Sequence, residues 1–355
     1  MITHSRHFAL FIALFITATV FAQLGVGNKK NIIQLAAGSS HNLALQNNGS
    51  LWAWGNNASG QLGDSSTTDR ENSVQVGTEN NWATVTAGGS FTHAIKKDGT
   101  LWGWGINKVG QLGISTKNLK YMYTTPVQVG KDNDWQAVSS GQYFTVGLKT
   151  DGTIWIWGAN IYYLLPKKTN QYEPLKIADK NNKDWKQIAA GDEFFMAIKK
   201  DGTIWTMGAI NKDNDKVLVK INEDTDWESI DAGRQHAMAI KKDGSLWGWG
   251  ANETGQLGNG TTVNSKDPVK VGENFAAVSA TANYTIAIKK FEGYILWWGK
   301  SWMNNTDQLK PAYAKGMSTY PLIAAGYNSL LMLIDNVSIM EFSKQHESGS
   351  VKMVK

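Results

Sequence analysis

Histidine is the first residue type in this sequence that could carry out chemistry, because it serves as a general base and as a metal ligand. His41 and His236 occupy equivalent positions in two copies of an internal repeat, whereas the other copies have Phe, Tyr or Ser there. A catalytic or metal centre that needs imidazole would not accept those residues. We therefore interpret both histidines as rings that fill space where a repeat begins, and His93 forms no set with them.

Three pairs of aspartates are spaced like the oxygen ligands of a calcium loop. They are Asp132/Asp134, Asp213/Asp215 and Asp224/Asp226. None has the Gly and the distal Glu of such a loop, so we predict solvated turns. The recurrent N-x-x-G-Q-L-G segments predict turns as well, and the sequence contains no nucleophile elbow, zinc-binding helix motif or phosphate loop.

These observations predict no catalytic residue, no cofactor and no bound metal. A polysaccharide-acting hydrolase or lyase stays open as an alternative, since its paired carboxylates have no sequence motif of their own. The chain has 355 residues with 36 Gly, 16 Trp and no Cys, which excludes a disulfide scaffold and a thiolate metal site. A net charge of +5 over this length does not indicate a nucleic-acid partner.

The first 22 residues have the order of a secretory signal peptide. A short segment with Arg6 and no acid precedes an apolar run over residues 8–20, and Val20-Phe21-Ala22 suits cleavage before Gln23. The apolar run is shorter than the roughly 18–20 residues of a spanning helix, which argues against an uncleaved anchor. We expect a secreted or cell-envelope protein, periplasmic or extracellular, with no membrane span after signal removal.

The remaining chain, residues 23–355, consists of one sequence unit repeated seven times. The copies start at Gly38, Gly88, Gly141, Gly191, Gly233, Thr281 and Gly326, between 42 and 53 residues apart. Within a copy, Asp98-Gly99 or its equivalent lies between two β-prone runs, which is typical of a tight hairpin. Strand-forming repeats of this length, without helical periodicity, predict a single toroid with one blade for each repeat.

The repeat consensus is G-x4-[AG]-[ILV]-K-x-D-G-[TS]-[IL]-W-x-W-G, followed in three copies by N-x-x-G-Q-L-G at residues 57–63, 107–113 and 252–258. This pattern resembles the regulator of chromosome condensation repeat family, in particular its secreted, alpha-tubulin-suppressor-like bacterial type. The resemblance implies an all-β fold, a seven-bladed β-propeller of four-stranded antiparallel blades. The last copy lacks Gln-Leu-Gly, so its outer strand must come from residues 24–36 or 351–355. We favour the N-terminal segment, because pairing it with the last blade hides open sheet edges.

A row of lysines is the first feature with a possible binding role. Each precedes a hairpin turn, and the row comprises Lys96, Lys97, Lys149, Lys199, Lys200, Lys241, Lys242, Lys289 and Lys290. Toroidal symmetry would place them in a ring on one rim, where cations attract anionic ligands. The alternative, which we favour, is a row of solvated strand ends that keeps the blade edges from aggregating.

The second feature is a pair of divergent loops, residues 114–126 and 159–174, after the third strand-like runs of the second and third copies. They contain Tyr121, Met122, Tyr123, Tyr162, Tyr163 and Tyr172, with Lys117, Lys120, Lys167 and Lys168. Tyr and Met are favoured at interfaces, and exposed aromatic rings also stack on sugars. Equivalent loops of adjacent blades should emerge side by side on one face. The alternative is that they pack against their own blades.

We therefore predict an exported, monomeric, non-enzymatic propeller that recognises a protein or a glycan through these rim loops. A secreted propeller that inhibits an extracellular enzyme, as one β-lactamase inhibitory protein with similar repeats does, is the first alternative. The resemblance also implies guanine-nucleotide exchange on a small nuclear GTPase. That activity depends on a protruding wedge hairpin, and no repeat here is expanded enough to contain an obvious one.

Overall fold

The computed structural model describes residues 32–115, 120–160, 169–180, 182–210, 217–290, 294–300, 307–313, 322–333, 339–343 and 351–354. Within these stretches every regular element is a β-strand. No helix in them is long and apolar enough to cross a membrane.

The strands form seven four-stranded antiparallel sheets, which we number in chain order. Sheet 1 contains β1 (Ile32–Ala37), β2 (His41–Gln46), β3 (Leu51–Gly55) and β4 (Arg70–Gln75). Sheet 2 contains β5 (Trp82–Ala87), β6 (Phe91–Lys96), β7 (Leu101–Ile106) and β8 (Met122–Gln128). Sheet 3 contains β9 (Trp135–Ser140), β10 (Phe144–Lys149), β11 (Ile154–Gly158) and β12 (Gln171–Lys176). Sheet 4 contains β13 (Trp185–Ala190), β14 (Phe194–Lys199), β15 (Ile204–Gly208) and β16 (Val219–Lys220).

The remaining three sheets repeat the same order. Sheet 5 contains β17 (Trp227–Ala232), β18 (His236–Lys241), β19 (Leu246–Gly250) and β20 (Ser265–Gly272). Sheet 6 contains β21 (Phe275–Ala280), β22 (Tyr284–Lys289), β23 (Ile295–Lys300) and β24 (Asp307–Tyr313). Sheet 7 contains β25 (Ile323–Ala325), β26 (Ser329–Leu333), β27 (Ile339–Ser343) and β28 (Val351–Val354).

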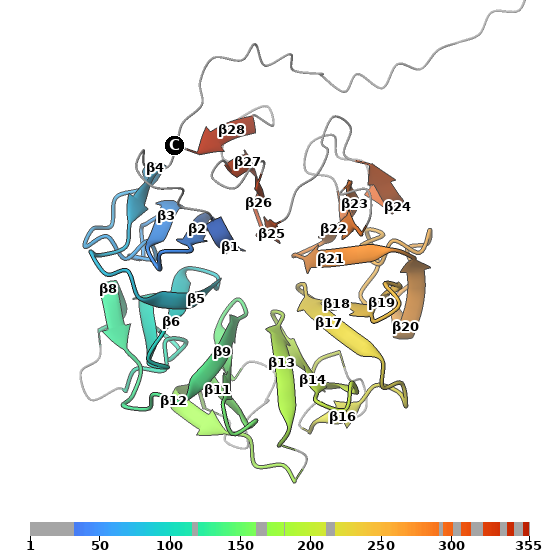
Figure 1. Cartoon of the computed structure of the whole chain (residues 1–355), viewed down its shortest axis with the longest axis horizontal. Helices are drawn as coiled ribbons and strands as arrows, with labels where there is room; N and C mark the ends of the chain where they lie inside the picture. Colours follow the sequence, from blue (N-terminus) through green and yellow to red (C-terminus); the bar gives the residue numbers. More distant parts are fainter. Residues whose placement is uncertain are drawn as a thin grey trace, which may run out of the picture.

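Figure 1 shows the sheets arranged around a central axis, with the first strand of each sheet innermost. Neighbouring inner strands are in contact all the way round, and β25 meets β1 where the ring closes. The predicted all-β propeller of four-stranded antiparallel blades is confirmed. The hairpin turns are where the sequence placed them: Gly99 has φ +82°, and a Cβ there would overlap the carbonyl oxygen of Asn133.

The expected route of ring closure was wrong. The outer strand of sheet 7 is the C-terminal β28, which pairs with β27, whereas residues 32–37 form β1 at the axis of sheet 1. Each sheet is thus one continuous segment of chain. The seam between sheets 7 and 1 is joined by contacts between sheets, including a hydrogen bond from Tyr327 N to Gly38 O of 3.3 Å.

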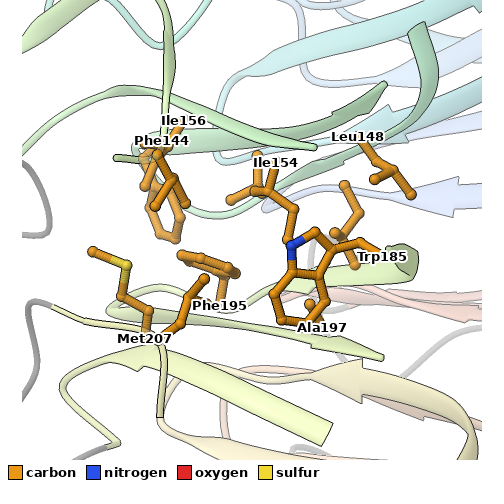
Figure 2. Packing of buried hydrophobic residues seen from close by; sticks show 12 residues of the cluster. Phe144, Leu148, Ile154, Ile156, Trp185, Phe195, Ala197 and Met207 are labelled. Atoms are coloured by element: carbon orange, nitrogen blue, oxygen red, sulfur yellow. The ribbon is translucent and has the colours of Figure 1, made fainter. Parts of the chain in front are cut away.

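Buried aromatic and aliphatic side chains fill the space between neighbouring sheets. Between sheets 3 and 4, Phe144 and Ile154 face Trp185, Phe195 and Met207 (Figure 2). Burying a large apolar side chain contributes roughly 1.5–3 kcal/mol. This packing, repeated around the ring, makes the sheets a rigid frame for the turns and loops at their ends.

Candidate functional site

The propeller has two faces with different contents. The turn after each inner strand and the loop after each third strand lie on one face, since Asn56 N donates to Ser40 O (2.8 Å) and Ala159 N donates to Tyr143 O (2.9 Å). We call this the axial face. The hairpin turns and the linkers between sheets lie together on the opposite face, where Lys97 N donates to Asn81 O (2.8 Å). We call that one the linker face.

On the linker face, the lysine that ends the second strand in each of sheets 2 to 6 is enclosed rather than presented to solvent. Lys149 Nζ lies 4.9 Å and 4.6 Å from the ring centroids of Trp135 and Trp155. Lys241 Nζ lies 4.8 Å and 5.2 Å from those of Trp227 and Trp247. Lys96 and Lys199 lie between equivalent pairs of indoles, and Lys289 lies over Phe275. These are cation–π contacts that stabilise the fold.

Two of the acidic pairs contact enclosed lysines, so the prediction that these pairs form solvated turns was incomplete. Asp132 and Asp134 contact Lys149 Nζ at 2.6 Å and 2.9 Å. Asp224 and Asp226 contact Lys241 in the same way. Burial alone would lower the pKa of Lys149, but the hydrogen bonds to the two carboxylates outweigh burial and raise it. Asp213 and Asp215 lie outside the described residues.

The lysine row therefore splits in two. The enclosed members are held by indoles, and only the second lysines Lys97, Lys200, Lys242 and Lys290 are exposed on the linker face. Neither sequence interpretation separated these two groups. Side chains two positions apart on a strand point to the same side of the sheet. This alternation could have indicated that a lysine two positions after an inward-facing residue also points inward.

The histidines are buried and neutral. His41 Nε2 lies 3.0 Å from Thr92 Oγ1, and His236 Nε2 lies 2.9 Å from Thr285 Oγ1. Burial lowers the pKa of His41 to about 4 and that of His236 to about 3. Burial likewise lowers the pKa of His93 to about 4. In the part of the chain that the structure describes, no three His, Asp or Glu side chains could hold a metal ion.

A pocket lies on the propeller axis, where the inner strands end. Its rim is a ring of glycines at equivalent positions, and a Cβ at Gly141 would overlap the carbonyl oxygen of Gly191 in the next sheet. The pocket has a volume of about 80 Å³. The residue after each glycine supplies its polar lining: Ser39, Gln142, Asp192, Arg234 and Tyr327.

The lining side chains interact across the axis. Ser39 Oγ donates to Gln142 Oε1 (3.0 Å), and the Tyr327 hydroxyl donates to Asp192 Oδ2. Arg234 Nε lies 3.7 Å from the same carboxylate oxygen. Burial raises the pKa of Asp192 to about 7, although Arg234 opposes that shift. Asp192 therefore titrates near neutrality at the centre of the axial face.

The two predicted rim loops do lie side by side on this face. Tyr121 is 64% exposed and Met122 is exposed beside it, whereas Tyr123 is half-buried against the hydrophobic cluster between sheets 1 and 2. Tyr121 O accepts from Asn107 N (2.7 Å). The Tyr172 hydroxyl donates to Lys108 O (3.4 Å), so the two loops flank the same 107–110 turn.

The other predicted binding residues, Tyr162, Tyr163, Lys167 and Lys168, lie outside the described residues, as does Lys117. Their role stays a prediction. Sequence reasoning missed the axial pocket and the exposed Tyr143 beside it. A signal was present: the position after the repeat glycine holds a different residue in every copy, namely Ser39, Gly89, Gln142, Asp192, Arg234, Ala282 and Tyr327.

Comparison with known proteins supports the repeat assignment. Two models described as "Regulator of chromosome condensation (RCC1) repeat" match the chain. The first matches residues 32–61, 82–111, 135–163 and 227–256, and the second matches residues 48–95, 98–148, 151–198 and 243–288.

Solved structures show the same fold at low sequence identity. Human WBSCR16 is 16% identical with a TM-score of 0.76, and the match covers 86% of this chain and 87% of that one. Prp20p from Saccharomyces cerevisiae is 21% identical with a TM-score of 0.72, covering 83% and 80%. The ectodomain of the Physcomitrella patens receptor kinase CR4 is 15% identical with a TM-score of 0.59, covering 88% and 74%.

Proposed function

Because this chain belongs to the regulator of chromosome condensation repeat family, we propose that it is a non-enzymatic propeller that binds a partner protein through its axial face. One observation carries the proposal. The residue that follows the first position of the repeat differs in all seven copies, and in six of them it lines the axial pocket. Five of these six residues are polar or charged, namely Ser39, Gln142, Asp192, Arg234 and Tyr327, and their convergence on one pocket supports a binding surface there.

The surroundings of the pocket support the same function. Tyr143 is 46% exposed on the turn next to Gln142, and Tyr121 and Met122 are exposed further out, where the outer strand β8 of the neighbouring sheet begins. Tyr and Met are enriched at the centres of protein interfaces. Two of the similar structures are of one yeast protein, Prp20p, and are described by what it binds: Gsp1p and histones in one, Kap60 in the other. Those partners belong to that protein, and they support protein binding only as a class.

Capture from the native medium tests the proposal. The triple variant Tyr121→Ala, Met122→Ala and Tyr143→Ala should lose a partner that the wild-type chain retains. The matched control carries Lys97→Ala, Lys200→Ala and Lys242→Ala on the linker face and should retain it. Equal retention by both variants would refute a role for the axial face. Competition by a soluble glycan, rather than by protein, would indicate the glycan alternative, and accelerated nucleotide release from a GTPase would indicate exchange.

We also propose that the chain is an exported monomer, supported by the signal-like order of residues 1–22. The mature protein should begin at Gln23 and elute as a single copy. Mass spectrometry and light scattering of the protein from culture medium or envelope test both points. A cytoplasmic chain that retains Met1 would contradict export.

A further inference from the structure

Arg234 is a half-exposed charged group that lines the axial pocket. Its side chain is 51% exposed, and its nearest carboxylate oxygen, on Asp192, lies 3.7 Å from Nε, beyond hydrogen-bonding distance. Asp192 instead accepts a hydrogen bond from Tyr327. Among the described residues the guanidinium of Arg234 donates no hydrogen bond, so its planar set of donors is available to an acceptor that enters the pocket from solvent.

Arginine is scarce in this chain, which makes its position informative. Lys and Arg together number 35, but only Arg6, Arg70 and Arg234 are arginines. Arg6 belongs to the predicted signal peptide, and Arg70 is paired with Asp64 at 2.7 Å. Lysine serves wherever the fold needs a cation on an indole or at a strand end. Arginine differs from lysine in binding a carboxylate through two parallel hydrogen bonds.

A second unused donor lies on the same pocket. Gln142 Oε1 accepts from Ser39, which leaves the Gln142 amide nitrogen as a donor without an acceptor among the described residues. The pocket volume of about 80 Å³ has room for several water-sized groups. That space admits the carboxylate end of an Asp or Glu side chain.

We propose that the axial pocket binds the carboxylate of an acidic side chain on the partner protein, with the Arg234 guanidinium as the anchor and the Gln142 amide as a second donor. This inference rests on the proposed function, because it names the chemistry by which that partner is recognised. It makes the axis, rather than the rim loops alone, the centre of the interface.

Asp192 sets the pH dependence of this binding. When ionised it competes with the incoming carboxylate for Arg234. The charged and titratable groups around it are Arg234 from the turn of sheet 5, Glu193 from its own turn and Tyr327 from sheet 7. With a pKa of about 7, Asp192 is mostly charged at pH 8 and mostly neutral at pH 6, while a Glu ligand stays ionised at both. Affinity should rise by up to about tenfold as the pH falls from 8 to 6.

Arginine side-chain NMR tests the proposal directly. Protein labelled with ¹⁵N-arginine gives at most three Nε–H signals, and single Arg→Lys variants assign them. Acetyl-Gly-Glu-Gly-amide should move the Arg234 signal and leave that of Arg70, whose carboxylate partner is already in place. The matched peptide with Gln in place of Glu should move neither, and Arg234→Gln should weaken binding of the Glu peptide about tenfold or more. Asp192→Asn should tighten binding and remove its pH dependence.

Four results would overturn the inference. One is an Arg234 signal that does not move at about 10 mM Glu peptide, a concentration that detects even very weak binding. Another is a peptide with Lys in place of Glu binding more tightly than the Glu peptide. The third is acetate binding as tightly as the peptide, which would assign the pocket to a free carboxylate. If a captured partner binds wild-type and Arg234→Gln chains equally, the proposed function stands and this inference fails.

Discussion

Replacing Glu341 by Gln should open the seam at which the propeller closes. In sheets 2 and 6 the buried indole of the third strand donates to a backbone carbonyl of the preceding sheet, as Trp104 Nε1 does to Gln61 O (2.9 Å). That carbonyl belongs to the Gln-Leu-Gly segment, which sheet 7 lacks. In sheet 1 the equivalent Trp54 Nε1 donates to the Glu341 carboxylate instead (2.8 Å).

A second side chain of sheet 1, on the neighbouring strand β2, also has Glu341 as its acceptor in place of a backbone carbonyl. Thr92 donates to Gln61 O, whereas the equivalent Asn42 reaches across the seam to Glu341 with Nδ2 (2.9 Å). Glu341 is buried, so these two hydrogen bonds are protected from water. Its carboxylate therefore takes, with two oxygens, the place of the carbonyl that Trp104 and Trp298 use in sheets 2 and 6.

The magnitude follows from these contacts. A Gln at position 341 has one oxygen and one NH₂ group, so one of the two donors at Trp54 and Asn42 loses its acceptor. A hydrogen bond to a charged group contributes about 1.5–3 kcal/mol, and a buried donor left unpaired costs a similar amount. We therefore expect E341Q to lower the free energy of unfolding by about 3 kcal/mol.

Urea unfolding of the whole chain measures this loss. The control is Glu228→Gln on the exposed side of β17, which should change the free energy of unfolding by less than about 0.5 kcal/mol. The double variant with Trp54→Phe should show a coupling energy of about 1 kcal/mol or more, since the two side chains share one hydrogen bond. Equal stability of E341Q and E228Q would refute the idea that this carboxylate joins the ring.

Three further outcomes test the packing and electrostatics of the frame. Lys149→Met should lower the free energy of unfolding by about 2 kcal/mol, because it removes the cation from between two indoles and two half-exposed aspartates. The control Lys97→Met should change it little. The pKa of His236 is lowered to about 3, so unfolding takes up a proton at this residue below pH 6.5, and its share of the stability should fall by about 1.4 kcal/mol per pH unit from there toward pH 4. His236→Phe should remove that share of the slope and leave the shares of His41 and His93. Gly141→Ala should destabilise by about 3 kcal/mol or more, because its Cβ overlaps Gly191 O, whereas Gly77→Ala, with open space around it, should lose only about 1 kcal/mol to backbone strain.

The fold could be predicted because its determinants are local and repeated. An Asp-Gly turn such as Asp98-Gly99 fixes one hairpin, and the repeat spacing fixes the number of sheets. The closure could not be predicted in the same way. It includes contacts such as that of Glu341 with Trp54, which lie 287 positions apart in the sequence, and no periodic pattern indicates such a contact.

The candidate site shows the same division between local and distant information. The exposure of Tyr121 follows from its place in a divergent loop, and the sequence indicated it. The meeting of Asp192, Arg234 and Tyr327 depends on three turns brought together by ring closure. Their variation was visible in the repeat alignment, but it gains meaning only once the fold places the position after the glycine on the axis.

The two faces of the propeller are therefore under different physical constraints. On the linker face, a residue such as Lys149 has its indoles and carboxylates within the frame, so a change there acts through stability. On the axial face, Arg234 and the Gln142 amide donate to no other described residue, and in the function that we propose a change there acts on what is bound. We therefore predict that a variant that weakens partner binding without lowering the free energy of unfolding maps to the axial face. Loss of binding from Lys149→Met at full stability would contradict this separation.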